Sequence, residues 1–113
     1  LDVSAIVNAQ HVDARMNGQL QHNVAGAAFE VYKPSVKDGD GDWSPFTRYV
    51  GFGKFNIVKV GDQVKSITPV IEPGANKLSL YNVIIEIKGG KPLIDNATST
   101  INFAVIPAMF NNN

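Results

Sequence analysis

The chain has 113 residues, a mass of 12.2 kDa and 44% apolar residues, which is the size of one ordinary domain. We expect a single globular β domain over residues 1–113. Ten Lys and Arg balance ten Asp and Glu, so the totals lack the strong positive field typical of duplex-binding domains. No apolar run approaches the roughly 18 residues of a membrane-spanning helix, and the absence of cysteine excludes disulfide scaffolds and thiolate metal sites.

Charge is distributed unevenly along the chain. Residues 1–42 hold six acids against three bases, a net of −3, whereas residues 43–113 hold four acids against seven bases, a net of +3. This asymmetry fits head-to-tail contact between copies, a basic face for a polyanion, or ordinary scatter. The chain opens at Leu1 rather than Met, which fits either proteolytic maturation, such as removal of a signal peptide, or an arbitrary boundary. Because cysteine is absent, the compartment stays open, with an extracellular surface or a virion as the favoured setting.

Alternation of period two, rich in Val, Ile, Thr, Phe and Tyr, predicts strands, and no apolar stripe of period 3.6 extends beyond two helical turns. In chain order, we expect about eight strands, at residues 2–7, 11–16, 19–32, 46–60, 63–71, 77–88, 92–95 and 99–107. Turn residues separate several of them, because Gly, Asn and Pro favour hairpin and type II turns. These turns are expected at Asn17-Gly18, Gly61-Asp62, Pro73-Gly74 and Gly89-Gly90. A change of apolar phase predicts a bulge or bend near Tyr81 and Asn82.

Short, evenly spaced strands joined by hairpin turns indicate an all-β fold. An antiparallel β-sandwich of about eight strands is the favoured architecture, because two packed sheets cover one apolar face each. The alternative is a small five-stranded barrel of the oligonucleotide-binding type.

An acidic loop places carboxylates at alternate positions, in Asp38, Asp40 and Asp42. This is the spacing by which a loop supplies oxygen ligands to Ca²⁺. The glycine and the bidentate Glu of an EF-hand loop are replaced by Trp43 and Tyr49. The alternative is a solvated turn, in which Asp and Gly serve the backbone geometry.

The segment 46–55 interleaves aromatic and basic residues, and one strand face would carry Phe46, Arg48, Phe52 and Lys54. Aromatic rings that stack on bases and cations that follow phosphates are typical of single-stranded nucleic-acid binding. The competing interpretation is core packing of the Phe rings, with the cations at the rim.

No constellation of catalytic residues accompanies these features, so we expect no enzyme. A hairpin at Asn17-Gly18 would place His22 opposite Asp13, but a surface ion pair explains this juxtaposition, since no activated nucleophile or oxyanion loop goes with it.

Three functions follow as hypotheses. The first is a structural domain that assembles with copies of itself in a virion or surface filament, because apolar residues near both ends could pair with a neighbouring sheet. At the start of the chain these residues are Val3, Ile6 and Val7, and at the end they are Ile101, Phe103, Val105, Ile106, Met109 and Phe110. The second is a single-stranded nucleic-acid binder, with nucleic acid as partner. The third is a secreted carbohydrate-binding module with calcium in the Asp38 loop and aromatic side chains on the sugar.

Overall fold

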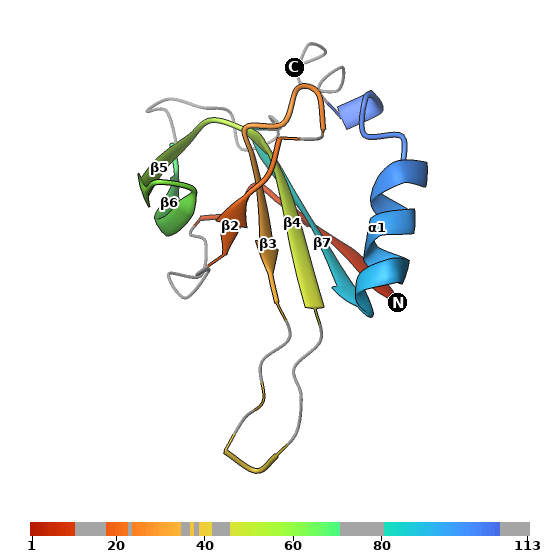
Figure 1. The fold of residues 1–113 in the computed structure, drawn as a ribbon. Helices are drawn as coiled ribbons and strands as arrows, with labels where there is room; N and C mark the ends of the chain where they lie inside the picture. Colours follow the sequence, from red (N-terminus) through yellow and green to blue (C-terminus); the bar gives the residue numbers. More distant parts are fainter. Residues whose placement is uncertain are drawn as a thin grey trace.

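The computed structural model describes residues 1–10, 18–22, 24–34, 37, 39–41, 46–70 and 81–106. Their elements are β1 (Asp2–Val7), β2 (Gln19–Leu20), β3 (Phe29–Lys33), β4 (Phe46–Gly53), β5 (Phe55–Val60), β6 (Gln63–Pro69), β7 (Asn82–Gly89) and α1 (Lys91–Thr100). Figure 1 shows the strands side by side, with α1 next to β7.

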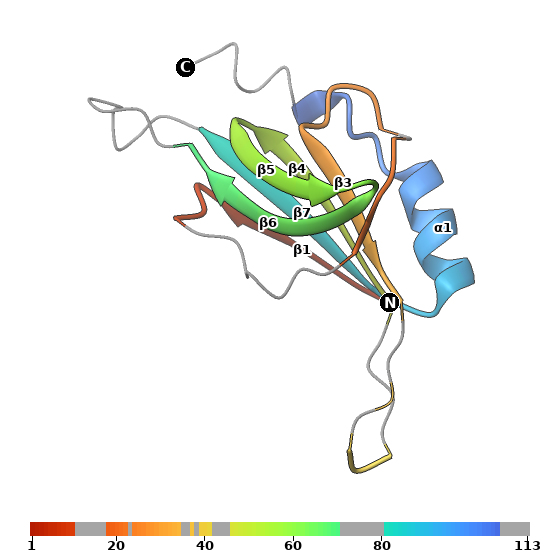
Figure 2. The ribbon, with the colours of Figure 1, turned by 60° about the vertical axis from the view of Figure 1, so that its left-hand side comes forward.

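All strand pairs are antiparallel, and the seven strands form one sheet in the order β1-β7-β4-β3-β2-β6-β5. The all-β, antiparallel prediction is confirmed. The strands form one curled sheet rather than two separate sheets, and this sheet does not close into a barrel. Figure 2 shows the β5–β6 hairpin curving across the rest of the sheet.

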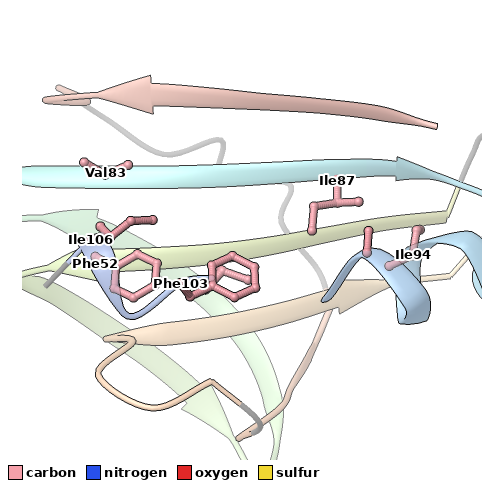
Figure 3. Close-up of a cluster of buried hydrophobic side chains, with 8 residues drawn as sticks. Phe52, Val83, Ile87, Ile94, Phe103 and Ile106 are labelled. Atoms are coloured by element: carbon pink, nitrogen blue, oxygen red, sulfur yellow. The ribbon is translucent and has the colours of Figure 1, made fainter. Parts of the chain in front are cut away.

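The two faces of the sheet bury separate apolar clusters. On the concave face, Val64 and Ile67 of β6 pack with Ile84 of β7 and with residues of β3. Figure 2 shows that the sheet curls, and this one cluster extends from β6 to β7 although three strands separate them in the sheet order. The opposite face packs against α1 and the segment after it, through Val50, Phe52, Val83, Ile87, Ile94, Ala97, Phe103 and Ile106 (Figure 3).

The hairpin between β5 and β6 forms where the sequence predicts it. Val60 pairs with Gln63, and Gly61 between them has a φ of +59°, as the first central residue of a type II′ turn requires. The single strand expected at 46–60 is interrupted after Gly53, whose φ is +118°. This break lets β5 leave the plane of β4 and pair with β6.

Strands expected at 92–95 and 99–107 are wrong, because residues 91–100 form α1 and residues 101–106 form no strand, while residue 107 lies outside the described residues. Ile94 and Ala97 are its buried residues, three positions apart and therefore on one helical face. Pro92 lies in the first turn, where its missing N–H costs no hydrogen bond. Packing of this one face on the sheet overrides a local composition of Asn, Thr and Ser that is unfavourable for a helix.

Other boundaries also differ from the prediction. The segment 19–32 contains two strands, β2 and β3, rather than one, and Gly89-Gly90 leads from β7 into α1 instead of forming a hairpin. The expected strand at 11–16 and the turn at Pro73-Gly74 lie outside the described residues, as do the first residues of the strand expected at 77–88.

Candidate assembly interface

The outermost strand on one side of the described sheet, β1, is exposed along its whole length. Its apolar side chains remain in water: Val3 is 51% exposed, Ile6 45% and Val7 59%. A single exposed apolar residue is ordinary in a folded protein. Three within six residues of an edge strand make a surface suited to pairing with another strand.

Three residues of β1 form an apolar ridge. The ridge lies on the same face of the sheet that α1 covers at the neighbouring strands β7 and β4. Val3, Ala5 and Val7, here named the β1 ridge, lie opposite Ile87, Ile85 and Val83 of β7, which face the α1 cluster. Because α1 packs against β4 and β7, the ridge continues the covered face beyond the helix.

The backbone of β1 also offers hydrogen-bonding groups to a partner. The N–H of Asn8 donates to the carbonyl of Asn82 at 2.8 Å, and this pair continues the β1–β7 register. Hydrogen-bonded pairs alternate along an antiparallel ladder. The even-numbered residues of β1 are therefore bonded to β7, whereas the N–H and C=O groups of the β1 ridge point away from the sheet.

A polar clasp fixes the end of β1 against β7. The side-chain carbonyl of Asn82 accepts from the N–H of Ala9 at 2.7 Å, and its amide donates to the Ala9 carbonyl at 3.1 Å. The side-chain oxygen of Asn8 accepts from the N–H of Tyr81 at 2.8 Å. Asn8 itself has a φ of +55°, which Asn tolerates better than most residues. The clasp holds β1 in one register, and no described strand pairs with its outer edge.

The opposite edge of the sheet, β5, is built differently. Its pairing with β6 shifts register between Val58 and Lys59, and bulges and lysines are two devices that discourage strand addition at an edge. Val58 and Val60 are 56% and 67% exposed, so β5 is as apolar as β1. β1 has neither device: its six residues pair with β7 without a shift and include no lysine or proline.

The residues expected to bind nucleic acid do not share one open face. Phe52 is 1% exposed and Arg48 is 6% exposed, and the Phe52 ring stacks against Phe103 with centroids 6.2 Å apart. Phe46 is half-buried, and Lys54 is exposed in the break between β4 and β5. The ring of Phe52 therefore fills the core beneath α1, which is the competing interpretation of this segment.

An aromatic pair with two charged neighbours lies at the start of α1. The rings of Tyr32 and Phe46 stack with centroids 5.9 Å apart, and Lys91 Nζ lies 6.0 Å from the Tyr32 centroid. Lys91 also pairs with Asp95 at 3.0 Å. The buried Tyr32 hydroxyl has no hydrogen-bond partner among the described residues, and burial raises the pKa of this phenol above its usual value.

An open cavity of about 400 Å³ lies next to this pair, on the outer side of β2, β3 and β6. Gln19 stands opposite both Tyr32 and Gln63 in the sheet register, so these three polar side chains form a row on one face. Gly18 and Pro34 complete the lining. Among the described residues, the polar side chains of this lining are two amides and one phenol, which can donate and accept hydrogen bonds.

Of the expected calcium ligands, Asp40 is exposed, and Asp38 and Asp42 lie outside the described residues. Within the described part of the chain, no group of three or more His, Asp or Glu side chains is placed to hold a metal ion. His22 is exposed, and its expected partner Asp13 also lies outside the described residues.

Sequence reasoning identified Val3, Ile6 and Val7 as candidates for assembly but missed what positions them. The partner strand β7 lies some eighty residues later in the chain, and no local pattern announces that pairing. The clasp of Asn82 on Ala9 is similarly invisible, because isolated Asn residues more often indicate turns.

No protein-family model, curated protein or solved structure matches this chain. Among the described residues, no helix is long and apolar enough to cross a membrane.

Proposed function

We propose that this chain is a structural, non-enzymatic β domain that assembles with copies of itself through β1. The observation that carries the proposal is the contrast between the two edges of the sheet. The pairing of β5 with β6 is interrupted by a bulge on β6 and β5 itself contains a lysine, whereas β1 combines exposed apolar side chains with a regular row of backbone donors and acceptors that point away from β7. An added strand would satisfy those groups and bury the β1 ridge.

Charge supports the same proposal. The chain has a formal net charge of zero at pH 7, so copies do not repel one another at long range. β1 contains one charged residue, Asp2, and the rest of the strand requires no desolvation of charge on pairing. A virion or a surface filament, which needs a second contact besides β1, is the kind of assembly in which such a domain would serve.

The test is molar mass by light scattering behind a sizing column, over a range of concentrations at low and high salt, with absorbance at two wavelengths. The proposal expects a mass above that of one chain that rises with concentration and carries no nucleic acid. A monomer at every concentration would overturn it. Nucleic acid that leaves at high salt, with loss of the larger species, would favour the nucleic-acid hypothesis instead.

A pair of matched variants locates the contact. Val3→Lys with Val7→Lys changes two exposed valines of β1, and Val58→Lys with Val60→Lys makes the same change in charge on β5. The β1 variant should be monomeric, because lysines on an edge strand oppose pairing, and the β5 variant should assemble as the unmodified chain does. Equal assembly of both variants would exclude β1 as the contact.

A further inference from the structure

We infer that the partner of β1 is the same strand of a second copy, antiparallel to it, on a two-fold axis through Ala5. The inference rests on the proposed self-assembly and adds its geometry. A two-fold axis perpendicular to the sheet relates antiparallel neighbours, so the same surface serves both copies. The two sheets then form one continuous sheet with β1 beside β1 at its centre.

The register follows from which backbone groups of β1 point away from β7. The outward groups belong to Val3, Ala5 and Val7, so in the paired strands odd-numbered residues must face odd-numbered residues. A shift of one residue would set outward groups against inward ones and reverse the side-chain faces. Two-fold axes through Ser4, Ala5 or Ile6 satisfy this condition.

Side chains select the axis through Ala5. With the axis at Ser4, the carboxylate of Asp2 would lie opposite the apolar Ile6. With the axis at Ile6, Val3 would face Ala9, which is buried and lies beyond the end of β1. The axis at Ala5 pairs Val3 with Val7 of the second copy on both sides and places Asp2 opposite Asn8. No like charges oppose each other, and the whole ridge is used.

Ala5 also has a side chain small enough to face its own counterpart across the axis. It lies between the two Val3–Val7 pairs and faces its own counterpart, on the side of the sheet where α1 packs. Since a perpendicular two-fold axis keeps corresponding faces together, the α1 helices of both copies lie on the same side and flank the combined ridge. The paired ridges would form one apolar strip between the helices.

Cysteine cross-linking reads the register directly, because the chain has no cysteine of its own. Hydrogen-bonded partners have Cα atoms about 5.5 Å apart, within the range that a disulfide bridges. Ala5→Cys should therefore form a disulfide-linked dimer by itself. Val3→Cys and Val7→Cys should each remain largely unlinked alone and form a mixed dimer together, since identical positions would be about 13 Å apart along the strands. Val58→Cys on β5 is the control for random oxidation.

A charge pair at the axis tests the same register without oxidation. Ala5→Lys and Ala5→Glu each place like charges opposite one another, so each variant alone should be monomeric. An equimolar mixture should restore the dimer at low salt and lose it at high salt. Ala5 is exposed, so both changes should leave the fold intact, as circular dichroism would show.

The outcomes separate this inference from the proposal on which it rests. A dimer that forms without Ala5→Cys cross-linking, and without rescue in the Lys and Glu mixture, would refute the register while self-assembly stands. Cross-linking of Val3→Cys with itself would indicate a different axis and refute it as well. A monomeric unmodified chain would remove the proposed function and the register together.

Discussion

Asn82 and Ala9 exchange two hydrogen bonds in a buried setting, at 2.7 and 3.1 Å, although 73 positions separate them in the chain. The Asn82 side chain is fully buried and Ala9 nearly so. One amide therefore satisfies both backbone groups of the residue at which the β1 segment leaves the sheet. Few other side chains offer a donor and an acceptor at this spacing.

We predict that Asn82→Ala lowers the free energy of unfolding by about 2–4 kcal/mol, because both the N–H and the C=O of Ala9 would be buried without partners. Urea unfolding measures the loss. Asn82→Asp is the informative control, because a carboxylate still accepts from the Ala9 N–H but cannot donate to its carbonyl. A cost below about 1 kcal/mol for Asn82→Ala would show that water replaces the clasp.

We predict that Phe103→Ala costs about 3–5 kcal/mol of stability. Phe103 is buried after the end of α1 and stacks on Phe52, so truncation leaves a cavity in the cluster of Figure 3. Val105→Ala, at a side chain that is 53% exposed, is the matched truncation nearby and should change stability by less than about 0.5 kcal/mol. Similar losses for both variants would contradict the burial of Phe103.

The ring of Phe29 lies directly against Gly51. A methyl group at Gly51 would overlap the Phe29 ring, and that ring is held edge-on to Phe55 at 4.9 Å. Gly51→Ala should therefore destabilise the fold by about 1–3 kcal/mol through overpacking. Gly39→Ala is the control, because a methyl group there would meet nothing within 4 Å.

The double variant of Gly51→Ala with Phe29→Leu identifies the cause of that loss. If the ring is what the new methyl group meets, the two changes should cost less together than the sum of their separate effects. Additive costs would place the strain elsewhere in β4.

Alkaline pH should weaken the fold through Tyr32. Burial raises the pKa of its phenol, so above the usual value of about 10 the unfolded chain releases a proton that the folded chain retains. Stability from this group is complete below pH 10 and falls as the pH rises above it. Tyr32→Phe should remove that part of the fall, which urea unfolding at pH 8 and pH 11 would measure.

At pH 8, Tyr32→Phe should change the free energy of unfolding by less than about 0.5 kcal/mol, because the lost hydroxyl has no hydrogen-bond partner among the described residues. An equally steep alkaline fall in Tyr32→Phe would attribute the effect to other groups.

The sequence predicts features that depend on neighbouring residues. The alternation of β1 and the Gly61-Asp62 turn are local, and the structure contains both. The helix at 91–100 was missed because the Asn, Thr and Ser of this segment have low helix propensity. The helix forms because Ile94 and Ala97 pack on the sheet. Gly90, Pro92 and the i, i+3 spacing of those two residues were the signals that could have indicated a helix.

The candidate interface was predictable only in part. The apolar residues of β1 are visible in the sequence, but their exposure depends on which strand is last in the sheet. That order places β1 beside β7 and leaves β5 at the other edge, and the pairings of β1 with β7 and of β2 with β6 that produce it join distant segments. Likewise, the aromatic and basic pattern at 46–55 cannot show that α1 covers Phe52.

During synthesis of the chain, β1 cannot pair with β7 until β7 has been made. Of the described strands, the first in the chain pairs with the last, with Asp2 beside Lys88 and Val7 beside Val83, so β1 is synthesised before the other described strands and β7 after them. Contacts of such long sequence separation form slowly. Until β7 has been made, the edge of β1 that β7 later covers has no β7 to pair with. The timing of translation thus bears on whether β1 first meets its own chain or a neighbour.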